Sequence, residues 1–287
     1  MLKVGFVGLG AMGAPIAGHL YRAGMLTAVA NRTHSKAEQF AAAHAGVIAV
    51  ANAAELPRHC DIVISAVTAD SDVIGLAQAL SQRAQPGFVL IDTSTIASTS
   101  AQQAAALLRA PGADFLDAPV SGGVEGANNG KLAVMLGGNG DTLERVRPAI
   151  ECFAARITHM GDVGAGQNTK AVNQVLVAGI AQAVTEGLSL GQALGLSPDR
   201  LLPTLLAGAA QSWFLEKRGA TMLQNQFSVG FKLTLLHKDL GIVRQLAIAA
   251  GVDHSIVDKS LHDYATLMSQ GHGDEDISAL IRLKRGG

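Results

Sequence analysis

The sequence contains few cysteines and no histidine pattern that would indicate a metal site. Only Cys60 and Cys152 are cysteines among 287 residues, and they do not form a CxxC pair. This scarcity argues against a disulfide framework, and reduced thiols are typical of a cytoplasmic protein. The nine histidines have neither HxxxH nor HExxH spacing. We therefore expect a cytoplasmic protein without a metal site.

The chain also lacks an excess of charge of either sign and an uninterrupted apolar run. Its 22 basic and 23 acidic side chains leave a formal net charge of −1, whereas a surface for nucleic acid or an anionic membrane is strongly basic. The largely apolar segment at residues 164–194 is interrupted by Gln182, Thr185 and Glu186, so it is not expected to span a bilayer. Neither a nucleic acid nor a membrane is an expected partner.

Apolar residues, in contrast, are abundant. They make up 48% of the chain, and charged residues make up only 16%. A chain of this length is long enough for two domains with their own cores. The composition predicts more apolar surface than a monomer usually exposes, which favours a homo-oligomer.

A glycine-rich loop near the N-terminus, GLGAMG at residues 8–13, is the first functional motif. It follows a short apolar run at residues 3–7 and precedes a helical pattern that ends near Gly24, and a second apolar run follows at residues 26–30. A strand, a GxGxxG loop, a helix and a second strand in this order predict a dinucleotide-binding site. The cofactor-binding residues expected in this loop are Gly8, Leu9, Gly10, Ala11, Met12 and Gly13.

The residues after the second apolar run select the cofactor. An NAD site has an acidic residue here for the ribose hydroxyls, whereas an NADP site has a cation and hydroxyl donors for the 2′-phosphate. Asn31, Arg32 and Thr33 follow the run, and no carboxylate is among them. Arg32 can make a forked, charge-assisted contact to a phosphate. The sequence therefore favours NADP(H) over NAD(H), with a solvated turn residue as the alternative for Arg32.

Two further buried strands are predicted at residues 61–67 and 88–92. Ligands of doubly wound sheets lie at the carboxyl ends of the strands, so residues at these ends are candidates for cofactor binding. A residue such as Ser94 or Thr95 could instead cap a helix that begins near residue 97. The expected cofactor neighbours are Val67, Thr68 and Thr95.

Ser121, Gly122 and Gly123 follow the next predicted strand, near residues 115–117. A hydroxyl followed by two glycines can present several hydrogen-bond donors to one anion. A plain tight turn explains the segment equally well. Further strands, at residues 131–136 and 156–160, complete the first domain.

Residues 164–194 predict one helix of roughly 28 residues, because the segment contains no proline and has a helical apolar pattern. Lys170, Asn173 and Gln174 lie three and four positions apart and therefore share one face of its first turns. Two interpretations are open at this stage. The helix is either a strut with a solvated lysine, or it carries an active site at a domain junction.

Only helical patterns follow this long helix. The sequence thus predicts an α/β Rossmann-type doubly wound sheet followed by an all-α C-terminal domain, joined by a long interdomain helix. The expected bounds are residues 1–163 for the cofactor domain, 164–194 for the long helix and 195–287 for the helical domain. Trp213, the only tryptophan, either packs in the helical core or lines the substrate pocket.

Four motifs occur along the chain in a characteristic order. They are GLGxMGxxxAxxL from Gly8, FxDAPVSGG from Phe115, GxGxxxKxxN from Gly164 and KDL from Lys238. In this combination the chain resembles the β-hydroxyacid dehydrogenase family, which includes 3-hydroxyisobutyrate dehydrogenase and several semialdehyde reductases. The resemblance covers the whole chain and implies a homodimer or a homotetramer.

The resemblance also implies a role for each motif. It implies that Lys170 is the catalytic residue, assisted by Asn173 or Gln174, and that the segment at residues 121–123 binds the substrate carboxylate. The glycine loop and Thr95 are implied to hold the nucleotide. In the second half, the implied cofactor residue is Lys238, and the implied substrate residues are Phe231 and Asp239.

The chemistry expected of Lys170 is proton transfer. Reduction of an aldehyde creates an alkoxide, which needs a proton donor within hydrogen-bond reach, and a neutral lysine can take the proton back during oxidation. We expect NADP(H)-dependent interconversion of a small 3-hydroxy acid, or another short hydroxy acid, and its semialdehyde. The expected substrate is therefore a small carboxylate. An imine reductase and a non-catalytic dinucleotide-binding relative are the alternatives, and Lys170 argues against both.

Overall fold

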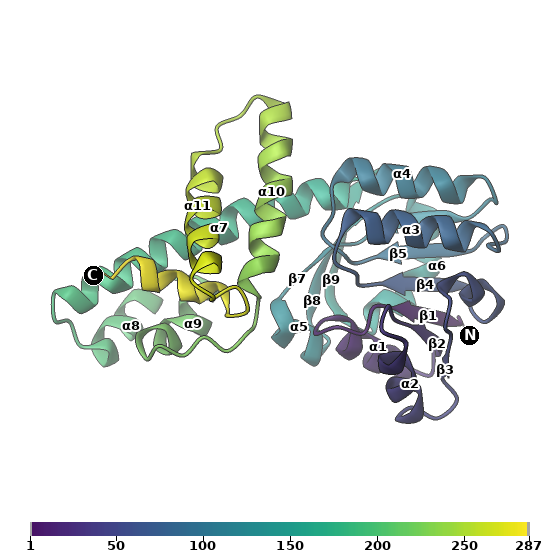
Figure 1. Cartoon of the computed structure of the whole chain (residues 1–287), viewed down its shortest axis with the longest axis horizontal. Helices are drawn as coiled ribbons and strands as arrows, with labels where there is room; N and C mark the ends of the chain where they lie inside the picture. Colours follow the sequence, from purple (N-terminus) through teal and green to yellow (C-terminus); the bar gives the residue numbers. More distant parts are fainter. Residues whose placement is uncertain (1, 286–287) are drawn as a thin grey trace. The chain divides into compact units, whose positions relative to one another are not determined.

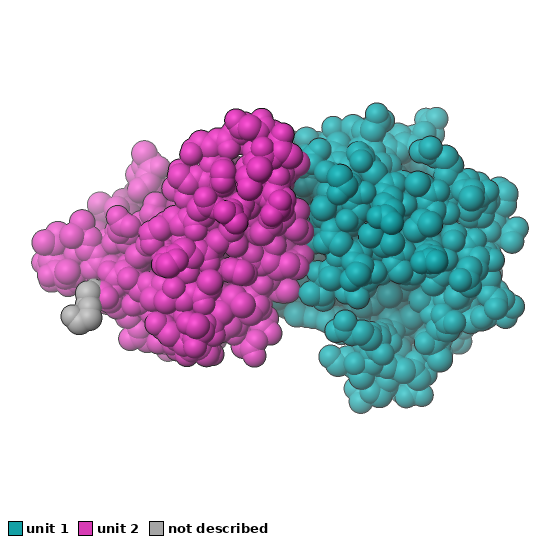
Figure 2. Space-filling model, turned by 45° about the horizontal axis from the view of Figure 1, so that its top comes forward, with its two compact units in different colours: residues 1–170 teal, residues 171–287 magenta. Residues whose placement is uncertain are grey.

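The computed structural model describes residues 2–285, and the chain forms two compact units. The first unit ends at Lys170, and the second begins at Ala171 (Figure 2). A helix of 29 residues, α7 (Ala165–Ala193), runs across this division. The long helix expected from the sequence is therefore present, while the domain bounds at residues 163 and 194 stay a prediction.

The first unit is built on one sheet with the strand order β3-β2-β1-β4-β5-β6-β8-β7, and β9 pairs with β8. The neighbouring strands from β3 to β6 run parallel, and β8 runs antiparallel to both β6 and β7. The order changes direction at β1, as in a doubly wound sheet. The strands are β1 (Val4–Val7), β2 (Leu26–Ala30), β3 (Ile48–Ala49), β4 (Ile62–Ser65), β5 (Val89–Asp92), β6 (Asp114–Asp117), β7 (Val120–Ser121), β8 (Leu132–Gly137) and β9 (Ala154–Gly161).

Helices cover both faces of this sheet. In Figure 1, α3 and α4 lie on one face, and α1 and α2 lie on the other. Successive side chains of a strand point to opposite faces, so Val4 and Phe6 pack in the core with α1, and Val7 packs in the core with α3. The helices are α1 (Gly13–Arg22), α2 (His34–Ala42), the 3-10 helix η1 (Ala53–Arg58), α3 (Asp70–Ser81), α4 (Ser98–Arg109), α5 (Gly123–Asn129) and α6 (Gly140–Glu151).

The second unit contains only helices among its described residues. Its core is apolar, and Leu236, Leu240 and Tyr264 are fully buried in it. No helix within residues 2–285 has the length and the hydropathy that a membrane span requires. Besides α7, the helices are α8 (Pro198–Leu206), α9 (Trp213–Leu223), α10 (Leu233–Ala250), α11 (Ser255–Ser269) and the 3-10 helix η2 (Ile277–Leu283).

This architecture confirms the predicted fold class, adds the short strands β3 and β7, which the sequence analysis did not predict, and shortens one predicted strand. The strand expected at residues 61–67 ends at Ser65, because the chain leaves the sheet there and α3 begins at Asp70. Val67 and Thr68 therefore lie in the loop at the carboxyl end of β4 rather than in the strand itself. This is the edge of the sheet where ligands of doubly wound folds bind.

Candidate active site

The loop between β1 and α1 contains three glycines of the GxGxxG motif. At two of them a side chain would clash with the protein's own backbone, and at the third it would not. A Cβ on Gly8, whose φ is +96°, would lie 2.2 Å from the carbonyl oxygen of Ala66, and a Cβ on Gly13 would lie 1.8 Å from that of Gly8. A Cβ on Gly10 would have no atom within 4 Å in the described part of the chain. Gly10 thus leaves open space above its backbone, which fits the close approach of a dinucleotide pyrophosphate.

Asn31 fastens this loop to the end of β2. The backbone N–H of Leu9 donates a hydrogen bond of 2.9 Å to Asn31 Oδ1, and Asn31 Nδ2 donates one of 3.0 Å to the carbonyl oxygen of Thr33. The predicted cofactor residues at 8–13 and 31–33 therefore lie together at the carboxyl ends of two neighbouring strands.

Arg32 is placed at the same edge of the sheet. Its side chain is 86% exposed, and its Nη1 lies 4.0 Å from Asp72 Oδ1. An ion pair this exposed contributes little to holding an arginine in one conformation. The guanidinium is therefore accessible to an anion at the end of β2.

A buried carboxylate, Asp92, joins the loops after β4 and β5. Asp92 Oδ1 accepts hydrogen bonds of 2.7 Å from both Ser65 Oγ and Ser94 Oγ, and Ser94 Oγ accepts one of 2.9 Å from the N–H of Val67. Burial raises the pKa of Asp92 to about 6, although these hydroxyl groups act in the opposite direction. This polar network therefore connects Val67, a predicted cofactor residue, to Ser94, which directly precedes Thr95.

The alternative role of Ser94 as a helix cap is wrong. The N-cap of α4 is Ala97, and its backbone N–H donates to Asp70 Oδ1 at 2.9 Å, while Ser94 is engaged with Asp92. Thr95 is half-buried, between buried neighbours, and Thr68 on the preceding loop is exposed. Both threonines lie at carboxyl ends of parallel strands.

The structure brings Lys170 to the predicted substrate segment. Lys170 is only 7% exposed, and its Nζ donates a hydrogen bond of 2.9 Å to the carbonyl oxygen of Val120. Ser121 follows directly at the end of β7, and Gly122, with a φ of +132°, turns the chain so that α5 begins at Gly123. Lys170 is therefore not the solvated lysine of a strut.

Asp117, at the end of β6, caps the helix that carries this lysine. Its Oδ1 accepts from the N–H of Gly164 at 2.7 Å, and its Oδ2 accepts from that of Gln167 at 2.9 Å. Carboxylates at such positions satisfy the first N–H groups of a helix and favour its dipole. Burial raises the pKa of Asp117, while these backbone hydrogen bonds lower it.

In the second unit, the amide residues of α7 and the KDL residues of α10 form one hydrogen-bonded chain. Asn173 Nδ2 donates to Gln174 Oε1 at 2.8 Å, and Gln174 Nε2 donates to Asp239 Oδ2 at 2.7 Å. Lys238 Nζ lies 2.9 Å from Asp239 Oδ1. Gln174 and Asp239 are buried, whereas Asn173 and Lys238 are partly exposed.

The two aromatic candidates of the second unit have different surroundings. The backbone N–H of Phe231 donates to Asp276 Oδ2 at 2.9 Å, which fixes the segment before α10. Trp213 is 47% exposed and lies under the guanidinium of Arg218, whose Cζ is 5.6 Å from the ring centre. Because Trp213 is this exposed, it does not pack in the helical core, which was one of its two predicted positions.

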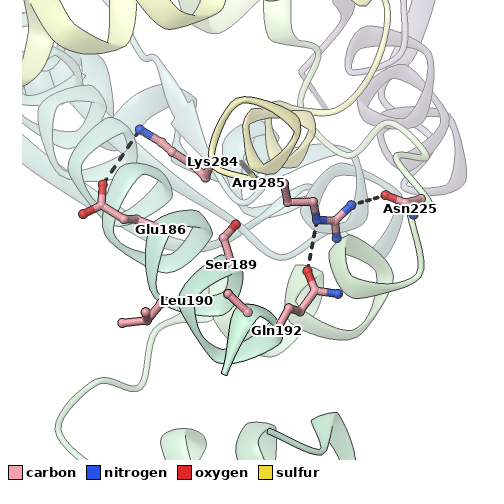
Figure 3. Close-up of a pocket in the computed structure, with 8 residues that line it drawn as sticks. Glu186, Ser189, Leu190, Gln192, Asn225, Lys284 and Arg285 are labelled. Atoms are coloured by element: carbon pink, nitrogen blue, oxygen red, sulfur yellow. Dashed lines mark hydrogen bonds and ion pairs between the residues drawn. The ribbon is translucent and has the colours of Figure 1, made fainter. Parts of the chain in front are cut away.

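The second unit also contains a surface pocket of about 700 Å³ formed by α7 and the C-terminal segment (Figure 3). Its two cations are already engaged: Lys284 contacts Asp263 at 3.3 Å, and Arg285 donates to Gln192 and Asn225. No predicted site residue lines it. The lining residues are Glu186, Ser189, Leu190, Gln192, Ala193, Asn225, Lys284 and Arg285.

Three polar residues of the first unit escaped the sequence analysis. Asp92 and Asp117 each end an apolar strand, and Gln167 lies one turn before Lys170. The sequence could have indicated Asp92 and Asp117, because each is a carboxylate at the carboxyl end of an otherwise apolar strand. Such a group is costly to bury without hydrogen-bond partners. Gln167 gave no comparable signal.

A doubly wound sheet with an open glycine loop, and a buried lysine beside a serine–glycine segment, define a dinucleotide-binding oxidoreductase. Residues 3–161 match the family model described as the NAD-binding domain of 6-phosphogluconate dehydrogenase. Residues 164–284 match the model described as NAD-binding of NADP-dependent 3-hydroxyisobutyrate dehydrogenase. The chain belongs to the β-hydroxyacid dehydrogenase family, which confirms the resemblance found in its motifs.

Named relatives cover nearly the whole chain. An NAD-dependent L-serine dehydrogenase of Pseudomonas aeruginosa is 35% identical, over 99% of this chain and 98% of the relative. A 2-hydroxy-3-oxopropionate reductase of Escherichia coli is 33% identical, over 98% and 96%. The solved structure of 3-hydroxyisobutyrate dehydrogenase from Mycobacterium tuberculosis with L-serine is 33% identical and has a TM-score of 0.89, with full coverage of both chains.

Proposed function

We propose that the protein is an NADP(H)-dependent dehydrogenase that interconverts a small 3-hydroxy acid, or another short hydroxy acid, and its semialdehyde, with Lys170 as general acid and base. The observation that carries this proposal is the hydrogen bond of 2.9 Å from Lys170 Nζ to the carbonyl oxygen of Val120, next to Ser121. A buried ammonium beside a candidate carboxylate-binding segment can reach the oxygen atom of a short substrate.

The reaction divides between the cofactor and the chain. A bound nicotinamide supplies the hydride in reduction and accepts it in oxidation. Lys170 donates a proton to the carbonyl oxygen as the aldehyde is reduced, and neutral Lys170 takes the hydroxyl proton in the reverse direction. The Ser121 hydroxyl and the N–H groups of Gly122 and Gly123 hold the substrate carboxylate.

We assign the residue that assists Lys170 as Asn173. Gln174 is 1% exposed, and both ends of its amide are engaged within the second unit, with Asn173 and Asp239. Gln174 is therefore suited to orient Asn173 rather than to bind substrate. The roles of Lys238 at the cofactor, and of Phe231 and Trp213 at the substrate, stay predictions.

The preference for NADP(H) is supported by Arg32. The arginine is exposed at the end of β2, and Asn31, which occupies the position before it, provides an amide where NAD sites have a carboxylate. The relative from Pseudomonas aeruginosa is named as NAD-dependent, so the cofactor preference needs a direct comparison of NADPH with NADH.

We also propose a homodimer or homotetramer in the cytoplasm. Val172 and Leu176, one turn apart on α7, are 62% and 61% exposed. Apolar side chains exposed in a row on one helix face are typical of protein–protein contacts. Cys60 and Cys152 are free thiols, as expected in a reducing compartment.

The test is turnover with a panel of substrates. Consumption of NADPH and NADH is measured with glyoxylate, succinic semialdehyde, tartronate semialdehyde and methylmalonate semialdehyde, and the reverse reaction with the corresponding hydroxy acids. L-serine belongs in the oxidation panel, because it is a 3-hydroxy acid and occurs in the names of two relatives. Turnover of at least one substrate is expected. The complete absence of turnover with both cofactors would overturn the proposal and favour the non-catalytic alternative.

A further inference from the structure

The side chain of Gln167 holds the backbone on both sides of Thr95. Gln167 Oε1 accepts a hydrogen bond of 3.1 Å from the N–H of Ile96, and Gln167 Nε2 donates one of 2.8 Å to the carbonyl oxygen of Ser94. The side chain is 2% exposed. One planar amide thus satisfies a donor and an acceptor of a turn that lies more than seventy residues earlier in the chain.

The same helical turn is fixed at two other points. Asp117 accepts the backbone N–H of Gln167, and Lys170, three residues later, donates to the carbonyl oxygen of Val120. The first turns of α7 therefore contact the turn after β5, the end of β6 and the segment before Ser121. All of these contacts lie within the first unit.

The turn around Thr95 is also held by hydrogen bonds between Ser94 and the ends of β4 and β5. Ser94 Oγ donates to the buried carboxylate of Asp92 and accepts from the N–H of Val67. Gln167 is the link between this network and the helix that carries Lys170. Without this link, a buried donor and a buried acceptor of the turn would lose their partners, which is costly in an apolar environment.

We infer that Gln167 is a positioning residue that sets the cofactor-binding turn at Thr95 at a fixed place relative to Lys170. The inference rests on the proposed function for the roles of Thr95 and Lys170. Gln167 itself acts only through the backbone of Ser94 and Ile96. Only an amide of this length offers an acceptor and a neutral donor at once, so neither Met nor ionised Glu can replace it.

The main experiment compares two buried glutamines of α7. Gln167→Met removes both contacts to the turn with little change in volume. Gln182→Met is the matched control, because Gln182 is 8% exposed and donates to Asp263 and Ser260 in the second unit. NADPH affinity is measured by fluorescence titration, hydride transfer by single-turnover reduction, and folding by the urea midpoint.

We expect Gln167→Met to weaken NADPH binding roughly tenfold and to slow single-turnover reduction by about 10–10²-fold, since small misplacements are costly for reacting groups. Gln182→Met should leave both quantities within about twofold, although it lowers the urea midpoint. Unchanged affinity and rate in folded Gln167→Met, or equal losses in both variants, would overturn the inference.

A second variant tests the donor directly. In Gln167→Glu the carboxylate can accept from Ile96 but cannot donate to the carbonyl oxygen of Ser94, whereas the protonated carboxyl can do both. NADPH affinity relative to wild type should therefore recover as the pH is lowered from about 8 to about 5. The ratio for Gln167→Met should not change with pH. A Gln167→Glu variant with pH-independent relative affinity would contradict the donor role.

The binding measurement separates this inference from the proposed function. Cofactor titration needs no substrate, so it gives a result for Gln167 even if wild type reduces none of the aldehydes. In that case the proposed function fails and the titration still decides the role of Gln167. If wild type is active and Gln167→Met binds NADPH normally, only the inference fails.

Discussion

At the scale of single residues, the proposed chemistry depends on Lys170. The side chain is buried and oriented by the carbonyl oxygen of Val120, and it is the only titratable group on the first turns of α7 (residues 165–175). We expect Lys170→Ala to lower turnover by roughly 10²–10⁴-fold and to leave nucleotide affinity nearly unchanged. Lys131→Ala, which alters an exposed lysine of the same unit, is the control. Near-normal turnover in Lys170→Ala would contradict the assignment.

Arg32 is the residue that decides the cofactor preference in our proposal. Arg32→Asp removes the exposed guanidinium and provides a carboxylate for ribose hydroxyls. The ratio of NADPH to NADH affinity should fall by about 10–100-fold, since a hydrogen bond to a charged group contributes about 1.5–3 kcal/mol. Both dissociation constants are measured on the same variant, so a general loss of folding does not mimic the result. An unchanged ratio would leave Arg32 as a solvated turn residue.

Asp92 gives a prediction for the pH dependence of stability. Its pKa is about 6 in the folded protein, above its ordinary value of 3.8, because it is fully buried and Asp117 is close. The folded state thus favours the protonated form, so the contribution of Asp92 to stability is full below pH 3.8 and is lost as the pH rises through 6.

Asp92→Asn removes this titration and keeps an acceptor for the two serines. Between about pH 4 and pH 8, wild type should lose about 2.5 kcal/mol of unfolding free energy relative to the variant. The measurement is urea unfolding of both proteins at each pH. A difference between the two proteins that stays constant with pH would show that Asp92 does not titrate in this range.

At the scale of elements, α7 is a helix whose first turn packs against backbone. A Cβ on Gly166 would lie 2.4 Å from the carbonyl oxygen of Met135 and 2.7 Å from that of Asp117. Neither atom can move without displacing a strand. The glycine is therefore required for the close approach that places Gln167 and Lys170.

Two glycine-to-alanine substitutions in α7 should change the stability of the protein in opposite directions. Gly166→Ala should destabilise the protein by about 1–3 kcal/mol or more, because it overpacks a backbone contact. Gly187→Ala should stabilise it by up to about 1 kcal/mol, since Gly187 is exposed and alanine favours the helix. Thermal or urea unfolding of both variants checks the pair. Equal shifts in the two variants would contradict the tight packing at Gly166.

Several elements were predictable because their patterns are local. The predicted range of β2 agrees with the structure at both ends, and residues 164–194 contain all of α7. Strand β4 was predicted too long because Ala66 and Val67 continue its apolar pattern. Just beyond the end of that strand, the N–H of Val67 donates to Ser94 Oγ, a partner 27 residues away that the local sequence does not reveal.

At the scale of the whole molecule, α7 also suggests how copies of the chain associate. Leu176→Glu places a charge in the exposed apolar row of this helix and should shift the proposed oligomer toward monomer. Gln103→Glu, at an exposed position of α4 in the first unit, adds the same charge away from that row and is the control. Light scattering after gel filtration measures the mass of both. An unchanged mass for Leu176→Glu would place the interface elsewhere.

The sequence by itself determined the class of the protein. Apolar runs of strand length, alternating with helical patterns, predicted the doubly wound sheet, and short motifs predicted the glycine loop, Ser121 and Lys170 as functional candidates. These features are local, because each is set by the identities and spacing of residues within a few turns or one strand.

Only the tertiary structure decided which distant residues hold these candidates in place. Asp92, Asp117 and Gln167 bind groups that lie from 27 to 73 residues away in the sequence. A polar side chain can be buried only where such partners meet it, and that meeting depends on the packing of the whole first unit. Burial and the hydrogen bond to Val120, which no spacing rule predicts, are what distinguish Lys170 from a solvated lysine.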